Sequence, residues 1–334
     1  MRGEPEERDQ AKAALGPIRT ILVGTSLRES SDAVVRAAHD IARSVGGRLE
    51  LVHSLSMDVL SPRFGTGWPE SGFYLKWSEM QREEMAAQIE RLKIDVPMHT
   101  TVASGAAYRV ISDVAEKVNA DLVVVGASDR GRFSKFLGTT ADRLLRSVNT
   151  PVMVVRGDWV FPPEKVLAPV DFSLLAADAM ECGLAFLLQA SASAPHVEVF
   201  FAVSEMQRTL AAPFSAEQIE RMAERELDRF ADEHLVSASF AHSSRVAIGS
   251  PAVEILKEIG RFGADLIVIG THGHGGVTRA LLGSVTRAVA AEADCPVLVI
   301  SPETALGASV AEAVLGETEP RWRIPDQVDK QLAK

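Results

Sequence analysis

The sequence carries one pattern of residues twice, about 145 positions apart. The run Ala120–Gly126 (ADLVVVG) matches Ala264–Gly270 (ADLIVIG), an offset of 144 positions (270 − 126). Further along, Thr150-Pro151-Val152 matches Cys295-Pro296-Val297 at an offset of 145 (296 − 151). A repeat of this length predicts two copies of one domain rather than a solenoid of short units. We place domain 1 at residues 17–157 and domain 2 at 164–302, with tails at 1–16 and 303–334.

Each copy alternates short apolar runs, rich in β-branched residues, with segments that have apolar residues at helical spacing. The runs predict strands at residues 20–24, 49–55, 98–102, 121–125, 150–155, 165–170, 197–203, 244–248, 266–269 and 295–300. The intervening segments predict helices at 31–45, 80–92, 108–118, 176–187, 217–230 and 253–262, with further helices from about 139 and 284. Strands that alternate with helices indicate an α/β fold with a parallel sheet covered on both faces.

Charge and hydropathy narrow the classes of partner. The net charge of −10 disfavours nucleic acid or an anionic membrane as a partner. Residues 1–16 have mixed charge and no apolar core, unlike a secretory signal, and no run of about 18 apolar residues predicts a membrane span. The two cysteines, Cys182 and Cys295, lie in different copies, and we interpret both as small structural hydrophobes. This pattern favours a cytoplasmic location.

The segment from Asp265 to Thr286 carries the strongest functional signal. A buried-strand run ends at Gly270, and a glycine-rich stretch with Gly273, Gly275 and Gly276 follows. Gly283 and Ser284 then begin a helical pattern. Glycines let main-chain N–H groups approach a ligand, and the start of a helix favours negative charge, so the segment predicts a phosphate site. The alternative is a surface loop with flexible glycines.

The spacing Gly270-x2-Gly273-x9-Gly283-Ser284 is neither a Walker A loop nor a GxGxxG fingerprint. It resembles the G-2x-G-9x-G-(S/T) signature of ATP-binding members of the universal stress protein family. Two further marks of that family are Val170-Asp171-Phe172-Ser173 and the closing run Pro296–Ile300. The resemblance covers about Ile18 to Ser301, as two tandem domains.

The resemblance implies two doubly wound, Rossmann-like domains, each with a five-stranded parallel sheet in the order 3-2-1-4-5. In dimers of the family the fifth strands pair across the interface. The resemblance therefore implies that Val152–Val155 and Val297–Ile300 meet within this chain and form an intramolecular pseudo-dimer. A further dimer of whole chains is left open.

In this strand order, ligands bind beyond the carboxyl ends of strands one and four. The resemblance implies that Asp171 binds the nucleoside, although Asp171 also fits a turn or a helix N-terminus. Small apolar residues at the ends of strands two and three would line the adenine pocket, or else belong to the core. Ser284 and Thr286 would donate hydroxyls to phosphate, or Ser284 would cap the helix. The expected ATP-binding residues are Pro169, Val170, Asp171, Val203, Val246, Ala247, Gly270, His272, Gly273, Gly275, Gly276, Gly283, Ser284, Val285 and Thr286.

His272 and His274 raise the question of a metal in the glycine-rich stretch. A zinc site is conceivable there, but the sequence offers no further ligand at a recognised spacing. We expect no metal site, and place both histidines near phosphate or solvent.

Domain 1 departs from this pattern at the matching positions. Ser26 stands where domain 2 has Asp171, and Asp129 replaces the second glycine of the signature. A carboxylate beside a phosphate would repel it. The distance from Gly126 to Gly138 is also one residue shorter than from Gly270 to Gly283. We therefore expect a degenerate nucleotide site in domain 1. A long connection at residues 56–79, which holds five aromatic residues, is expected to cover its crevice or contact a partner.

The leading hypothesis is a stress-response protein that binds ATP in domain 2. No catalytic residues are assigned, and any ATP hydrolysis is expected to be slow and to need Mg²⁺. One alternative is a scaffold of the same family that binds no nucleotide, or binds a small ligand at the aromatic connection. Another is an enzyme of the adenine-nucleotide α-hydrolase type, which would need substrate motifs that are not found. The sequence identifies no protein partner.

Overall fold

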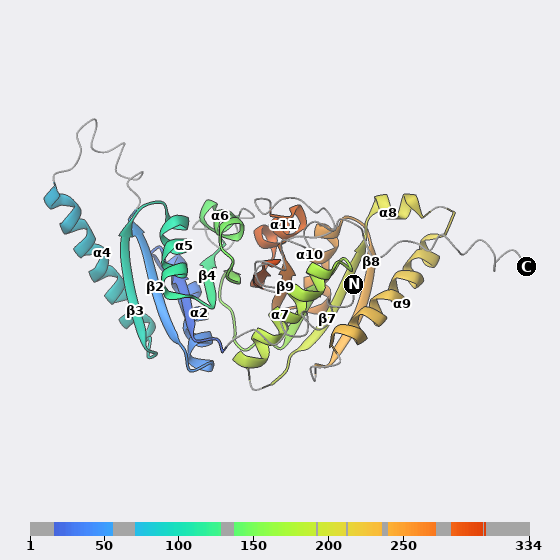
Figure 1. Ribbon diagram of the computed structural model, residues 1–334, viewed down its shortest axis with the longest axis horizontal. Helices are drawn as coiled ribbons and strands as arrows, with labels where there is room; N and C mark the ends of the chain where they lie inside the picture. The colour runs from blue at the N-terminus through green and yellow to red at the C-terminus, as the bar shows by residue number, and fades with distance from the viewer. Residues whose placement is uncertain are drawn as a thin grey trace, which may run out of the picture.

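The computed structural model describes residues 17–55, 71–127, 137–191, 193–211, 213–235, 240–271, 282–302 and 304, with only the backbone at 71–74. These residues form a ten-stranded sheet in the order β3-β2-β1-β4-β5-β10-β9-β6-β7-β8 (Figure 1). The first half contributes β1 Thr20–Gly24, β2 Arg48–Leu55, β3 Met98–Ser104, β4 Leu122–Gly126 and β5 Val152–Val155. The second half contributes β6 Lys165–Pro169, β7 His196–Val203, β8 His242–Ile248, β9 Leu266–Gly270 and β10 Val297–Ile300.

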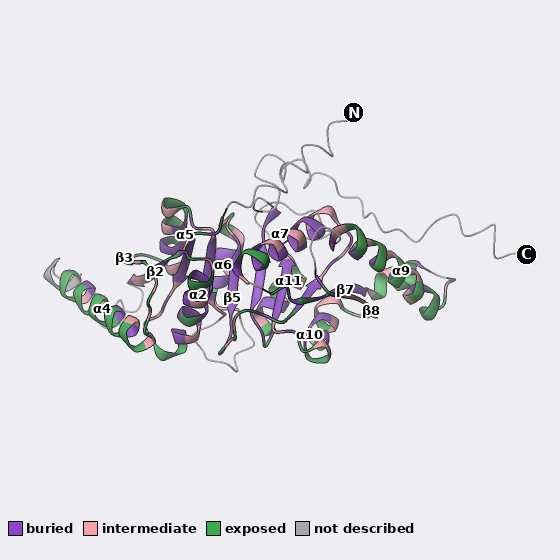
Figure 2. Ribbon diagram, turned by 90° about the horizontal axis from the view of Figure 1, so that it is seen from below, coloured by how far each residue is buried: buried purple, intermediate pink, exposed green. Residues whose placement is uncertain are grey.

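Helices cover both faces of the sheet. The helices of the first half are η1 Glu29–Ser31, α2 Asp32–Ser44, α4 Ser71–Leu92, α5 Ala107–Val118 and α6 Thr139–Ser147. Those of the second half are α7 Leu174–Ala190, α8 Glu205–Leu210, α9 Ala216–Leu235, α10 Pro251–Phe262 and α11 Ser284–Glu292. The helices α2, α4, α7 and α9 pack on one face, and α5, α6, α10 and α11 pack on the other. Figure 2 shows buried strands between helices whose outer sides are exposed.

The observed topology confirms the predicted fold class. Within each half the strands run parallel in the order 3-2-1-4-5, so each half is a doubly wound sheet. The central strands are runs of Ile, Leu and Val that are buried on both faces, as expected for a covered parallel sheet. The two halves join through β5 and β10, which pair antiparallel with Met153 opposite Leu298. The predicted pairing of the fifth strands is therefore confirmed.

Polar contacts next to β5 and β10 tie the two halves together. Arg156 Nη2 donates to the carbonyl oxygen of Ala291 in the last turn of α11, at 2.6 Å. In the reciprocal direction, Ser301 Oγ donates to the carbonyl oxygen of Asn149, at 3.3 Å. Each half thus contributes one side chain that bonds a backbone carbonyl near the end of the last helix of the other half.

An ion pair also crosses the pseudo-two-fold axis. Arg287 Nε lies 3.0 Å from Asp142 Oδ1. Asp142 is the fourth residue of α6, and Arg287 is the fourth residue of α11. In two identical halves this position would face its own copy and place like charges together. The two copies have diverged to opposite charges at this point.

We predict that the Asp142–Arg287 pair makes a small, coupled contribution to stability. Arg287→Asp and Asp142→Arg should each lower the free energy of unfolding by about 0.5–1 kcal/mol, because Arg287 is 60% exposed and such pairs are screened. The double swap Asp142→Arg/Arg287→Asp should recover only part of the loss, as measured by urea unfolding, because Asp142 also pairs with Arg146 at 3.2 Å and the swap removes that pair. Strictly additive losses in the double variant would show that the two charges do not interact.

Two helices differ from the sequence prediction. The structure begins α4 at Ser71, whereas the prediction placed residues up to 79 in a loop. Pro69 and Gly72 suggested a loop, but residues 73–79 contain no helix breaker and continue the helix. The short helix α8 was not predicted. It is fixed by a capping box in which Ser204 and Gln207 bond each other's backbone.

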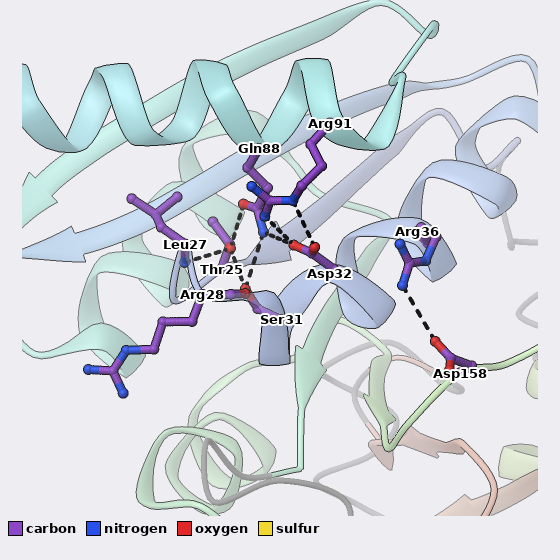
Figure 3. A network of polar contacts seen from close by, with 9 residues as sticks. All are labelled: Thr25, Leu27, Arg28, Ser31, Asp32, Arg36, Gln88, Arg91 and Asp158. Carbon is purple, nitrogen blue, oxygen red and sulfur yellow. Dashed lines mark hydrogen bonds and ion pairs between the residues drawn. The ribbon is translucent and has the colours of Figure 1, made fainter.

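In domain 1, a polar network holds α4 against the start of α2 (Figure 3). Arg91 donates through Nε and Nη2 to the two oxygens of Asp32, at 3.0 and 2.8 Å. Gln88 donates to Asp32 at 2.8 Å and accepts from the Thr25 hydroxyl at 2.9 Å, and that hydroxyl also contacts Ser31. Burial by itself raises the pKa of Asp32, but the donors outweigh it and hold that pKa below its usual value.

The corresponding packing in domain 2 is aromatic instead of polar. The ring of Phe172 lies 4.5 Å from that of Phe201 and 5.6 Å from that of Phe230, centroid to centroid. The two domains therefore share a topology, but different interactions hold their helices beside strand one.

No helix in the described part of the chain is both long and apolar enough to cross a membrane. Among the same residues, no three or more His, Cys, Asp or Glu side chains are grouped so that they could hold a metal ion.

Candidate functional site

The expected site of domain 2 lies at the carboxyl ends of β6 and β9. These strands are parallel neighbours, with Val166 opposite Leu266 and Leu167 opposite Ile267. Asp171 follows β6 by two residues, and Gly270 is the last residue of β9. The carboxyl ends of adjacent parallel strands lie at the same sheet edge, so both residues lie at that edge.

Asp171 is held in a defined turn at this edge. Its Oδ1 accepts hydrogen bonds from the backbone N–H of Ser173 at 3.1 Å and from the Ser173 hydroxyl at 2.6 Å. Ser173 in turn caps α7 by accepting from the N–H of Ala176. Phe172, between Asp171 and Ser173, has a φ of 61°, a left-handed conformation that is uncommon outside glycine. The turn role left open by the sequence is present, and it fixes the half-buried carboxylate at the carboxyl edge of the sheet.

Two hydrogen bonds join the start of α11 to the end of β9. Gly283 donates its N–H to the carbonyl oxygen of Thr271 at 2.9 Å. The buried Thr286 hydroxyl donates to the carbonyl oxygen of Gly270 at 2.7 Å. A Cβ atom at position 283 would lie 3.0 Å from the Thr271 carbonyl oxygen, so a side chain there would crowd the backbone. Glycine at 283 is therefore explained by close approach rather than by flexibility.

This arrangement decides two of the open interpretations. Gly283 is the N-cap of α11, and no side chain caps the helix, so the prediction that Ser284 caps it is wrong. Ser284 is the first helical residue and is exposed. The single hydroxyl proton of Thr286 is used within the protein, where it joins α11 to the end of β9.

The first turn of α11 is suited to an anion. The N–H groups of Ser284, Val285 and Thr286 occupy the first three helical positions, where no carbonyl oxygen within the helix can accept them. They lie next to the end of β9 and carry the positive end of the helix dipole. Phosphate or carboxylate is the chemical class that such a helix start binds.

The apolar residues proposed for the adenine pocket divide into two groups. Val203 is 0% exposed and Val246 is 3% exposed, and both belong to the hydrophobic core together with the buried Val170. For these residues the core role is what the structure shows. Pro169 and Ala247 are half-buried at the sheet edge, where a ligand could contact them.

Several predicted positions lie outside the described residues. They are His272, Gly273, Gly275 and Gly276 of domain 2 and the aligned Ser128 and Asp129 of domain 1.

The described residues at the matching edge of domain 1 differ from those of domain 2. Ser26 replaces Asp171, and its buried hydroxyl has no hydrogen-bond partner among the described residues. Gly138 keeps the bond to strand four, donating to the Ala127 carbonyl oxygen at 2.6 Å. Ala141 occupies the position of Thr286, so the bond from that hydroxyl to the end of strand four is absent here.

Domain 1 instead has a cavity that the sequence analysis missed. A space of about 320 Å³ lies between the start of α2 and the ends of β4 and β5. Its lining includes Glu29, Ser30, Val34, Gly126, Val155 and Arg156. An ion pair between two further lining residues, Arg36 and Asp158, spans 3.5 Å beside it (Figure 3). The lining comes from three separate segments, so no sequence spacing signals it.

Comparison with known proteins gives the family of this chain. A sequence model of the universal stress protein family matches residues 17–156 and again residues 163–301. The chain belongs to the universal stress protein family. It is a tandem member, because the match occurs twice.

Relatives and solved structures agree with this assignment. A universal stress protein of Mycolicibacterium smegmatis is 28% identical over 296 residues, covering 84% of this chain and 97% of the relative. One from Methanocaldococcus jannaschii is 52% identical over 144 residues, covering 41% of this chain and 82% of the relative. The crystal structure of a universal stress protein from Archaeoglobus fulgidus matches with a TM-score of 0.60 at 20% identity, covering 84% and 96% of the two chains. This last likeness shows the shared fold.

Proposed function

We propose that this universal stress protein binds ATP at the carboxyl edge of domain 2. The proposal rests on the position of Gly283, where an added Cβ would lie 3.0 Å from the carbonyl oxygen of Thr271. This close approach supports the proposal because the first amides of α11 then lie at the end of β9, on the same sheet edge as Asp171. A strand, a glycine turn and a helix start in this order form a phosphate-binding arrangement.

Each part of the nucleotide has a complementary group on the protein. The phosphates would accept hydrogen bonds from the N–H groups of Ser284, Val285 and Thr286, together with the glycine-rich stretch. The Asp171 carboxylate would accept from ribose hydroxyls or from the adenine amino group. Pro169 and Ala247 offer half-buried apolar surface to the base. Mg²⁺ would accompany the triphosphate and neutralise part of its charge.

The role of this binding is proposed to be that of a switch or a stabiliser in a stress response, rather than rapid catalysis. The sequence has no Walker lysine next to the glycines, and no Ser-His-Asp arrangement is assigned. Any hydrolysis of ATP should be slow and depend on Mg²⁺.

Thr286 provides a test of the proposed site. Thr286→Val removes the bond to the Gly270 carbonyl but keeps the shape. ATP binding should weaken by up to about tenfold, because binding must then also hold the start of α11 in place, which one buried hydrogen bond of about 1–1.5 kcal/mol does in the wild type. Thr286→Ser keeps the hydroxyl and should bind nearly as the wild type. A titration with a fluorescent ATP analogue measures both. Equal affinities for the Val and Ser variants would contradict the fastening role of the hydroxyl.

The cavity of domain 1 favours a second candidate function. Its volume of about 320 Å³ suits a small molecule, and its lining mixes charged with apolar residues. The alternative predicted a ligand at the aromatic connection, but residues 56–70 lie outside the described residues. Mass spectrometry of molecules released from the purified, denatured protein would distinguish the candidates: ATP supports the first function and a different small molecule the second.

A further inference from the structure

Two buried carboxylates meet under α10 in domain 2, on the side of the sheet away from α7 and α9. Glu198 lies on β7 and Glu258 on α10, and each residue is only 4% exposed. Arg261 of α10 and Arg245 of β8 approach them from the rim of the cluster. Neither carboxylate belongs to the proposed nucleotide site.

One guanidinium bridges the two acids. Arg261 donates through Nη2 to Glu198 Oε2 at 2.6 Å and through Nε to Glu258 Oε1. These two nitrogens form a single edge of the guanidinium group, and this edge commonly grips both oxygens of one carboxylate. Arg91 uses the same edge in that way on Asp32 in domain 1. Because this edge of Arg261 bonds one oxygen of Glu198 and one of Glu258, the two carboxylates are held next to each other.

The surroundings of the second carboxylate oxygen of Glu198 favour the protonated form of this side chain. Glu198 Oε1 is buried and has no hydrogen-bond partner in the part of the chain that the structure describes. A buried carboxylate oxygen without a donor is costly when ionised, whereas a protonated carboxyl has a hydrogen to donate to the neighbouring acid. Glu258 already receives Arg245 Nε at 3.2 Å as well as Arg261, so it is the acid better suited to carry the charge.

We propose that Glu198 and Glu258 share one proton near neutral pH, and that loss of this proton loosens the packing of α10 on β7 and β8. The helix α10 begins immediately after β8, at the carboxyl edge of the sheet, and ends at Phe262 at the opposite edge. A change in its packing therefore reaches the side of domain 2 where the candidate site lies.

Among the described residues of β6, β7, β8 and α10, the other cationic groups have partners elsewhere, as Lys257 does in Glu254. Arg245 and Arg261 already bond the two acids. Lys165 of β6 donates to the Phe262 carbonyl oxygen instead, and His196 of β7 contacts the hydroxyl of Ser243. Burial first, and then the neighbouring Glu258, raise the pKa of Glu198 to about 7, against the opposing effect of Arg261.

The direction of the pH dependence follows from this raised pKa. The pKa of Glu198 in the folded domain exceeds its ordinary value of 4.5, so the contribution to stability is fully present below about 4.5. It is lost as the pH rises through about 7. Over this range α10 should become easier to open as the solution becomes more alkaline.

Domain 1 supplies a matched control in the same chain. Glu50 is the third residue of β2, as Glu198 is of β7, and it is 5% exposed. The position that corresponds to Glu258 holds Val114 on α5, so Glu50 has no carboxylate facing it from that helix. Arg48 Nε and His99 Nδ1 lie 3.8 and 3.9 Å from Glu50 instead.

Hydrogen–deuterium exchange on the full chain without nucleotide tests the proposal. Exchange of α10 amides, corrected for the intrinsic dependence on pH, should speed up more than about tenfold between pH 5.5 and pH 8 relative to α5. Glu198→Gln should abolish this difference, and Glu50→Gln should leave it intact. If Glu198→Gln does not fold, Glu258→Gln replaces it, with the same expected result.

Two outcomes would overturn the proposal: no difference between α10 and α5 in the wild type, or an unchanged difference in the glutamine variant. Since the experiment contains no ATP, its result is independent of whether domain 2 binds a nucleotide.

Discussion

A Gly283→Val chain is expected to bind ATP at least about a hundredfold more weakly than the wild type. The valine Cβ would lie 3.0 Å from the Thr271 carbonyl oxygen, so the start of α11, where the phosphates are proposed to bind, would have to shift. Gly283 has a φ of −54°, which valine can adopt, so the loss should come from steric exclusion rather than from backbone strain. Titration calorimetry measures the affinity, and circular dichroism checks that the variant is folded.

The tandem repeat provides the control for this variant. Gly138 is the N-cap of α6, as Gly283 is of α11, and its N–H makes the equivalent bond to the end of strand four. Gly138→Val should leave ATP binding unchanged if only domain 2 holds the nucleotide. Equal losses in both variants, or wild-type affinity in Gly283→Val, would refute the assignment of the site.

Gly183→Ala is expected to destabilise domain 2 by about 2–3 kcal/mol. A Cβ atom on Gly183 of α7 would lie only 2.3 Å from Val268 Cγ1 on the central strand β9, so helix or strand must shift. Overpacking of this kind costs about 1–3 kcal/mol or more, which exceeds the gain in helix propensity of about 1 kcal/mol. Val268→Ala in the same chain should recover much of the loss, because it removes the clashing methyl. Chemical denaturation monitored by circular dichroism gives the free energies of unfolding.

Gly260 of α10 serves as the comparison for Gly183. No atom lies within 4 Å of a Cβ built at this helix position. Gly260→Ala should therefore stabilise the protein by about 0.5–1 kcal/mol through helix propensity alone. If Gly183→Ala were as harmless as Gly260→Ala, the close packing of α7 on β9 would be contradicted.

The fold could largely be predicted from the sequence, because both of its determinants are local or repeated. Apolar runs such as Leu266–Gly270 identify buried strands, and the repeat fixes two domains. The strand order came from the resemblance, and the structure agrees with it. The extension of α4 to Ser71 was missed because Pro69 and Gly72 favoured a loop. The capping box of Ser204 and Gln207 is visible in the sequence and could have identified α8.

The candidate site was predictable in part. The sequence placed Asp171 and Gly270 at one sheet edge, and in the structure Asp171 follows β6 and Gly270 ends β9. It could not separate a fully buried Val203 from a half-buried Ala247, because both are small apolar residues at strand ends. The Asp142–Arg287 and Glu198–Glu258 contacts could not be predicted from the sequence for another reason. They join residues far apart in the chain, and only the pairing of elements in space brings them together.

Calorimetric titration of the full-length wild-type chain with ATP, and separately with AMP, tests the central claim most directly. The proposed site predicts one ATP per chain, with AMP bound more weakly because it lacks the β- and γ-phosphates that α11 would hold. Two equivalent ATP sites per chain, equal affinity for AMP, or no binding of ATP would contradict the claim that domain 2 alone binds the triphosphate.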